Sequence, residues 1–165
     1  RVEGRTAADL GASAGGFTTA LLERGARRVY AIDAGVGQLL GRLRIDPRVV
    51  TLEGCNIGAL TPSQVPEVVD VVTMDLSYLA LADALPQLRA LVLSPAADLV
   101  ALVKPTFELR RARLAAGDAD VAAAVRAVRT AARSCGWRPL GTVRAPRTGR
   151  AGAAECFLHA RWVGP

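Results

Sequence analysis

Residues 8–18, with the sequence ADLGASAGGFT, constrain the fold of this chain more than any other stretch. The apolar start is typical of a buried strand, and Phe17 with the leucines that follow at helical spacing predicts a helix. Between them, Gly11, Gly15 and Gly16 lack a Cβ atom, so the backbone can turn tightly and approach a ligand closely. In open parallel α/β sheets, ligands bind outside the carboxyl ends of the strands, where such turns lie. We therefore expect an α/β protein with a ligand site at this turn.

The residues of the turn indicate which ligand to expect. A dinucleotide site needs glycine where this chain has Ser13, and an ATP-binding P-loop needs Lys after the last glycine, where this chain has Phe17. A nucleoside ligand without a phosphate clamp remains, and S-adenosylmethionine is the expected cofactor. The alternative is a turn that serves packing alone.

Two further positions predict contacts to such a nucleoside. Asp33 ends the strand predicted at 28–32, about 20 residues after the turn, where ribose hydroxyls are usually bound. Its alternative role is that of a helix cap or turn residue. Asn56 and Ile57 follow the strand predicted at 48–52 and could contact the adenine, although an Asn in a turn needs no ligand to explain it. The predicted cofactor contacts are Asp9, Gly11, Ser13, Gly15, Gly16, Phe17, Asp33, Asn56, Ile57 and Asp75.

The bulk composition predicts one cytoplasmic domain over residues 1–165. A hydrophobic share of 51% is enough for a core at this length. Neither a membrane-spanning run of about 20 apolar residues nor a signal segment is visible. The three cysteines form no Cys-x-x-Cys pair, so we expect no disulfide framework and no metal site. The oligomeric state stays open.

Basic residues are concentrated in the second half of the chain. From Lys104 onward there are 12 basic and 4 acidic residues, against 9 and 11 before it. This excess favours a polyanionic partner, nucleic acid first. The alternative is a compositional bias, because all basic residues except Lys104 are arginines.

Hydrophobic patterning predicts alternating strands and helices followed by an antiparallel hairpin at the edge of the sheet. The predicted strands are 6–10, 28–32, 48–52, 68–75 and 98–103, with 138–143 and 155–163 forming the hairpin. The predicted helices are 16–24, 37–43, 81–92 and 120–134, and residues 105–108 are expected to start a loop.

Three charged residues could carry out chemistry beside the glycine turn. Asp75 and Lys104 end neighbouring predicted strands, and Glu155 enters the last one, so the three side chains could meet. Such a group suits deprotonation of a hydroxyl nucleophile. Lys104 would accept or orient the proton, and the carboxylates of Asp75 and Glu155 would hold the Lys104 ammonium in position. The protonation state of Lys104 stays open, and a surface lysine without a catalytic role is the alternative.

Four segments together resemble the methyltransferase domain of the TlyA haemolysin-like family, which is related to the FtsJ type of ribose methyltransferases. The segments are Asp9–Thr18, Met74–Tyr78, Ala101–Glu108 and Glu155–Leu158. The resemblance implies a Rossmann-like seven-stranded sheet with helices on both faces, S-adenosylmethionine, and 2′-O-methylation of cytidine in ribosomal RNA. It also implies that the catalytic set of the family carries over as Asp75, Lys104 and Glu155.

The sequence also departs from the pattern of this family. The family's first catalytic lysine and its S4-like RNA-binding domain precede the segment seen here, and whether their absence is natural or a truncation stays open. Residues 111–118 replace a glycine-rich segment, and Ala154 replaces an asparagine. A catalytically silent cofactor-binding fragment and a membrane-active haemolysin are therefore the alternatives to an enzyme.

The expected partner is ribosomal RNA or a ribosomal subunit. Two aromatic residues, Tyr78 and Phe107, follow the catalytic strand ends and could stack on a flipped base, although such residues more often close a core. The predicted RNA contacts are Arg110, Arg111, Arg113, Arg144, Arg147, Arg150, Tyr78 and Phe107.

Overall fold

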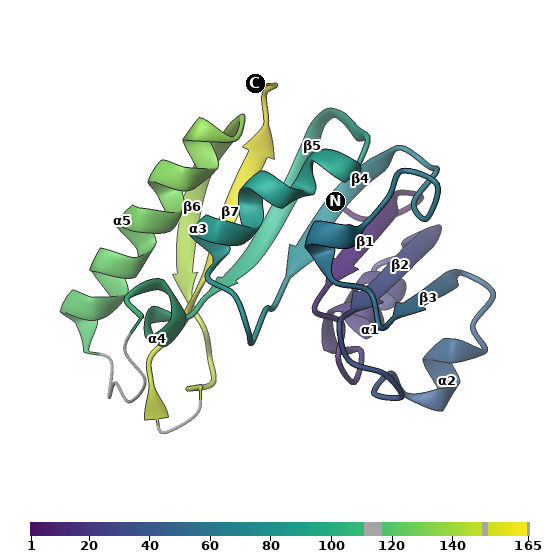
Figure 1. Cartoon of the computed structure of the whole chain (residues 1–165), viewed down its shortest axis with the longest axis horizontal. Helices are drawn as coiled ribbons and strands as arrows, with labels where there is room; N and C mark the ends of the chain where they lie inside the picture. Colours follow the sequence, from purple (N-terminus) through teal and green to yellow (C-terminus); the bar gives the residue numbers. More distant parts are fainter. Residues whose placement is uncertain (111–116, 150–151, 165) are drawn as a thin grey trace.

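A seven-stranded mixed sheet forms the centre of the computed structural model, which describes residues 1–110, 117–149 and 152–164 (Figure 1). The strands lie in the order β3-β2-β1-β4-β5-β7-β6. They are β1 (Thr6–Leu10), β2 (Arg28–Asp33), β3 (Val49–Glu53), β4 (Val69–Met74), β5 (Leu93–Val103), β6 (Trp137–Arg144) and β7 (Cys156–Trp162). The Rossmann-like, seven-stranded fold predicted from the sequence is confirmed.

Helices cover both faces of this sheet, and each face has its own apolar core. On one face, α1 (Gly16–Glu23) and α2 (Gly41–Arg44) bury leucines such as Leu21 and Leu43. On the other, α3 (Leu81–Ala84), the 3-10 helices η1 (Ile57–Ala59) and η2 (Leu85–Ala90), and α5 (Asp118–Ser134) join a larger core that includes Trp137. Strands covered on both faces are buried along almost their whole length, as β1 and β4 are, which explains why neither alternates between apolar and polar residues.

Four predicted elements differ from those observed. The helix predicted at 37–43 is the one-turn helix α2, which begins at Gly41. The helix predicted at 81–92 is α3 followed by η2, and Pro86, which has no N–H to donate, lies where the α-helix ends. Residues 105–108, predicted to start a loop, form the one-turn helix α4 (Pro105–Glu108). β5 begins five residues before the predicted 98, because the register with β4 shifts between Val69 and Val71 and adds an irregular segment.

The predicted C-terminal hairpin is confirmed and determines where the last strand lies. β7 pairs antiparallel with both β5 and β6, so β6 is the edge strand. Within the β5–β7 pair, Val103 lies opposite Cys156. The residues that follow and precede them, Lys104 and Glu155, therefore lie at the same edge of the sheet.

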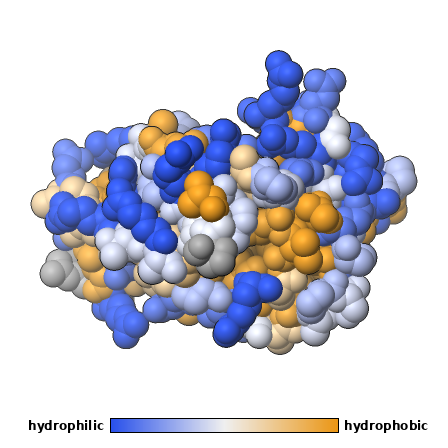
Figure 2. All heavy atoms as spheres, turned by 90° about the horizontal axis from the view of Figure 1, so that it is seen from above, coloured by the Kyte–Doolittle hydropathy of each residue, from blue (hydrophilic) through white to orange (hydrophobic). Residues whose placement is uncertain are grey.

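The surface is mainly polar where it is viewed from above in Figure 2. Hydrophilic side chains cover most of this face, and the hydrophobic side chains gather in smaller patches between them. In the part of the chain that the structure describes, no helix combines the length and the apolar character that crossing a membrane requires.

Candidate active site

The turn after β1 requires glycine at two positions. Gly11 has φ +82°, and a Cβ atom there would collide with the backbone carbonyl oxygen of Asp75. Gly15 has φ +97°, and its Cβ atom would collide with the side chain of Leu43. The turn is held against β2, because the Gly11 amide donates to the carbonyl of Ile32 at 2.9 Å. The turn is thus packed closely between its neighbours on both sides.

Asp33, at the end of β2, closes a pocket with this turn. Its carboxylate accepts hydrogen bonds from the backbone amides of Ser13 at 2.8 Å and Gly35 at 2.7 Å. A pocket of about 400 Å³ lies further along the same edge, but the one at the turn is smaller, about 250 Å³. The residues that line this smaller pocket are Gly11, Ser13, Asp33, Ala34, Gly35, Gln38, Asp75, Ser77 and Tyr78.

The residues present fit a nucleoside cofactor. Each oxygen of the Asp33 carboxylate accepts one amide hydrogen bond and keeps a further lone pair for a ribose hydroxyl. Tyr78 supplies an aromatic wall. The predicted contacts Gly15 and Gly16 do not line this pocket, and the space around a Cβ position at Gly16 is open.

Several predicted cofactor contacts lie outside this pocket. Phe17 packs edge to face against Phe157 of β7, with ring centroids 6.0 Å apart. Asn56 uses its side-chain oxygen to accept the Gly58 amide at 3.0 Å and thereby caps η1, and Ile57 is buried in the core. None of the three side chains lines the pocket, because each is engaged in packing or capping.

Asp9 is fully buried behind the turn and does not line the pocket either. Its carboxylate accepts hydrogen bonds from the hydroxyl groups of Thr18 on α1 at 2.6 Å and Thr73 on β4 at 2.8 Å. Burial raises the pKa of Asp9 from 3.8 to about 6, although both hydroxyl groups oppose the shift. Asp9 therefore ties α1 and two strands together at the turn.

The raised pKa of Asp9 predicts that stability depends on pH. The folded chain binds this proton more tightly than the unfolded chain, so the stabilisation is present below about pH 4 and is lost as the pH rises through about 6. Relative to Asp9→Asn, we expect the wild type to lose about 3 kcal/mol of unfolding free energy over this range. Urea unfolding of both proteins at each pH measures the difference. The same dependence of unfolding free energy on pH in both proteins would contradict the raised pKa of Asp9.

Lys104 lies between two oxygen acceptors at the carboxyl edge of the sheet. Its ammonium nitrogen is 2.6 Å from Oδ1 of Asp75 and donates to the hydroxyl of Ser77 at 3.0 Å. The Lys104 side chain is 13% exposed, and the Oδ1 atom of Asp75 is shielded from solvent. The hydrogen bond to Ser77 and the ion pair with Asp75 hold the ammonium in place, and its remaining N–H capacity is left for a substrate oxygen.

Glu155 lies near this pair without a direct ion pair among the described contacts. Its carboxyl is half-buried beside Gly149, where a Cβ atom would collide with it. Burial raises the pKa of Glu155, the positive charge of Lys104 lowers it and the negative charge of Asp75 raises it. The structure therefore brings the three predicted catalytic residues into one electrostatic group.

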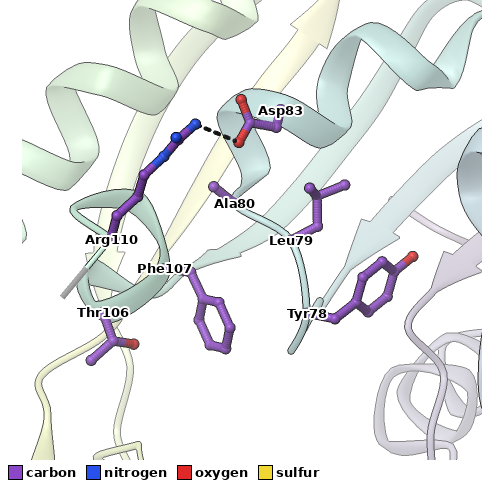
Figure 3. Close-up of a pocket in the computed structure, with 7 residues that line it drawn as sticks. All are labelled: Tyr78, Leu79, Ala80, Asp83, Thr106, Phe107 and Arg110. Atoms are coloured by element: carbon purple, nitrogen blue, oxygen red, sulfur yellow. Dashed lines mark hydrogen bonds and ion pairs between the residues drawn. The ribbon is translucent and has the colours of Figure 1, made fainter. Parts of the chain in front are cut away.

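A groove with aromatic walls adjoins Lys104 on the side away from β2. It has a volume of about 400 Å³ and contains Phe107 of α4 and Tyr78 of the loop after β4 (Figure 3). The ring of Phe107 also lies 5.9 Å from the Lys104 ammonium. Tyr78 lines both this groove and the pocket at the turn, so it stands at the boundary between them.

The predicted RNA-binding arginines are only partly described. Arg110 pairs with Asp83 at 3.4 Å, Arg144 pairs with Asp118 at 3.2 Å, and Arg147 is exposed. The three arginines and the two paired aspartates lie at the surface, where such ion pairs contribute little to stability. Arg111, Arg113 and Arg150 lie outside the described residues.

Comparison with known proteins identifies the family of the chain. A model of the family described as FtsJ-like methyltransferase matches residues 1–162. The chain belongs to the FtsJ-like methyltransferase family. The resemblance inferred from the four sequence segments is thereby confirmed.

Two curated relatives within this comparison carry different names. The chain is 45% identical over 165 residues to the protein of Mycobacterium tuberculosis named 16S/23S rRNA (cytidine-2′-O)-methyltransferase TlyA. That match covers 97% of this chain but only 61% of the relative. Hemolysin A of Brachyspira hyodysenteriae is 37% identical over 117 residues, or 70% of this chain and 48% of that protein.

Solved structures show the same fold. A protein from Streptococcus thermophilus, provisionally named a hemolysin, superimposes with a TM-score of 0.90 at 32% identity, over 98% of this chain and 60% of that one. The fibrillarin pre-rRNA processing protein of Methanococcus jannaschii has a TM-score of 0.74 at 15% identity, over 99% and 69% of the two chains, which shows the fold alone.

Some residues at this edge of the sheet were not predicted from the sequence. Ser77 follows Asp75 by two residues, a spacing that in retrospect indicates the same edge of the sheet. Glu108 accepts the Leu81 amide at 2.6 Å and caps α3, and burial raises its pKa. Gln38 accepts a hydrogen bond from the Ser13 hydroxyl at 3.2 Å. No sequence pattern predicts this contact, because it depends on the path of the loop after β2. Among the described residues, no cluster of His, Cys, Asp and Glu suited to a metal ion occurs.

Proposed function

We propose that the chain is an S-adenosylmethionine-dependent methyltransferase that methylates the ribose 2′-hydroxyl of cytidine in ribosomal RNA. The observation that carries the proposal is the contact of Lys104 with Asp75 and Ser77 beside the pocket at the turn. A lysine held by two oxygen acceptors suits a reaction at a hydroxyl group. The name of the Mycobacterium tuberculosis relative supports cytidine and ribosomal RNA as the substrate.

Each part of the site has a role in this proposal. Asp33 and the amides of the turn hold the nucleoside, and S-adenosylmethionine, when bound, supplies an electrophilic methyl group. Lys104 orients the 2′-hydroxyl, its deprotonated amine accepts the hydroxyl proton as the oxygen takes the methyl group, and Asp75 and Ser77 hold the ammonium that results. Alignment of the reacting atoms supplies most of the acceleration. Tyr78 and Phe107 line the groove where the flipped base would stack.

Methyl-labelled S-adenosylmethionine tests the reaction directly. The chain is incubated with purified 16S or 23S ribosomal RNA and, separately, with ribosomal subunits. We expect label in the RNA and protection of one phosphodiester bond from alkaline cleavage, because a 2′-O-methyl group removes the attacking hydroxyl. Label in a base, or no transfer to any of these substrates, would contradict the proposal.

Substitution of Asp33 tests the cofactor site separately. We expect Asp33→Ala to weaken S-adenosylmethionine binding roughly 10-fold to 100-fold, since a hydrogen bond to a charged group contributes about 1.5–3 kcal/mol. Isothermal titration calorimetry measures the affinity. Asp46→Ala, which removes a carboxylate paired with Arg48 in a surface turn, is the matched control and should bind like the wild type. Equal affinities in the two variants would contradict the assignment of Asp33.

A further inference from the structure

A second groove, which the proposed reaction does not use, runs between α5 and β6. Its volume is about 490 Å³. The side chains that give it its chemical character are Arg126 and Arg129 of α5, Arg144 and Thr142 of β6, and the apolar Val121 and Val125. We call it the α5–β6 groove.

The helical repeat of α5 explains why arginines face this groove. Ala124, Val128 and Ala132 are buried against the sheet. Arg126 and Arg129 are three residues apart, so they are neighbours on one flank of the helix, beside the buried stripe. Val125 precedes Arg126, lies about one helical turn from Arg129 and lines the same groove, which gives the arginine stems an apolar support.

The charge of the groove is strongly unbalanced. Three guanidinium groups line it, and Asp118 is its one carboxylate among the residues described there. Asp118 pairs with Arg144 at 3.2 Å, and its side chain is 90% exposed, so solvent screens this pair strongly. An anionic partner can therefore displace Asp118 easily, and the groove as a whole favours negative charge.

One end of the groove borders the candidate active site. Arg144 lies opposite Cys156 in the β6–β7 pair, and Cys156 lies opposite Val103 in the β5–β7 pair. The next residues in the chain are Glu155 and Lys104. From this edge the groove follows α5, which begins beside α4 and rises along β6 and β7 (Figure 1).

We infer that the α5–β6 groove binds the sugar-phosphate backbone of the RNA next to the nucleotide that is methylated, an inference that rests on the proposed function. Guanidinium groups bind phosphate oxygens with two parallel hydrogen bonds. Contacts of this kind position an RNA strand without reading its sequence. The groove thus extends the substrate site well beyond the nucleotide at Lys104.

The double variant Arg126→Gln/Arg129→Gln tests this surface. Its affinity for a labelled ribosomal RNA fragment, measured by fluorescence anisotropy over a range of salt concentrations, should fall roughly tenfold, and the slope of log K against log salt should become shallower by about 1.4, or 0.7 for each lost contact to a single strand. In the methylation assay, KM for RNA should rise while kcat and S-adenosylmethionine affinity stay unchanged.

The matched control is Arg133→Gln/Arg138→Gln. It removes the same net charge, with one arginine taken from α5 and one from β6, but both residues are exposed and lie at the end remote from Lys104, outside the groove. If both double variants weaken RNA binding equally, net charge explains the effect and the groove assignment is overturned. If Arg126→Gln/Arg129→Gln binds RNA normally but no longer methylates assembled subunits, the groove assignment is overturned. The groove would then bind a ribosomal protein. RNA binding through Arg126 and Arg129 without any methyl transfer would support the groove and contradict the proposed reaction.

Discussion

Replacing Lys104 by methionine is expected to lower kcat for RNA methylation by a factor of about 10²–10⁴, the range typical of a lost acid-base group. Methionine keeps the length of the buried stem but removes the charge and all three N–H groups. Asp75 and Ser77 then lose the ammonium that they orient at 2.6 Å and 3.0 Å. Single-turnover methylation with labelled S-adenosylmethionine measures the chemical step directly.

Two controls separate the chemistry of Lys104 from folding and binding. The Lys104→Met variant should bind S-adenosylmethionine like the wild type, because Lys104 does not line the pocket at the turn. Lys104→Arg should not restore activity, because a guanidinium is planar, larger and unable to lose a proton near neutral pH. Full activity of Lys104→Met, or full rescue by arginine, would contradict the role assigned to Lys104.

The sequence predicted the contact of Lys104 with Asp75 because strand ends are easy to locate. Continuous apolar runs define β4 and β5, and polar residues directly after two neighbouring parallel strands must lie at the same edge. The same reasoning placed Asp33 correctly at the pocket. No special knowledge of side-chain packing was needed for these three residues.

Residues whose surroundings depend on packing could not be assigned in this way. Asp9 follows an apolar run and precedes a glycine, as a ligand contact would, but Thr18 and Thr73 enclose it from elements 9 and 64 residues away. Asn56 has an amide suited to an adenine, yet a local turn satisfies it first. Burial and capping are properties of the assembled fold, so a single sequence does not distinguish them from ligand binding.

Replacing Gly11 by alanine is expected to have the largest effect on stability. The backbone at Gly11 has φ +82°, and a conformation of this kind costs a residue with a Cβ atom about 1–2 kcal/mol. The Cβ atom would in addition collide with the backbone carbonyl of Asp75. Asp75 is fixed at the end of β4, because its amide donates to the carbonyl of Leu10. A total loss of about 3 kcal/mol should lower Tm by roughly 6–12 °C. Since Asp75 must move, methylation should fall as well.

Gly16→Ala is the matched comparison for Gly11→Ala, because it adds the same methyl group five residues further along the same turn. The Cβ position at Gly16 is open and φ is not positive, so Tm should stay close to that of the wild type. If the open space at Gly16 accommodates the cofactor, however, its affinity should fall in calorimetric titration. Thermal unfolding and cofactor binding of both variants thus separate a glycine required by the backbone from a glycine required by the ligand. Equal Tm values for the two variants would contradict the collision at Gly11, and wild-type affinity of Gly16→Ala would move the cofactor away from the start of α1.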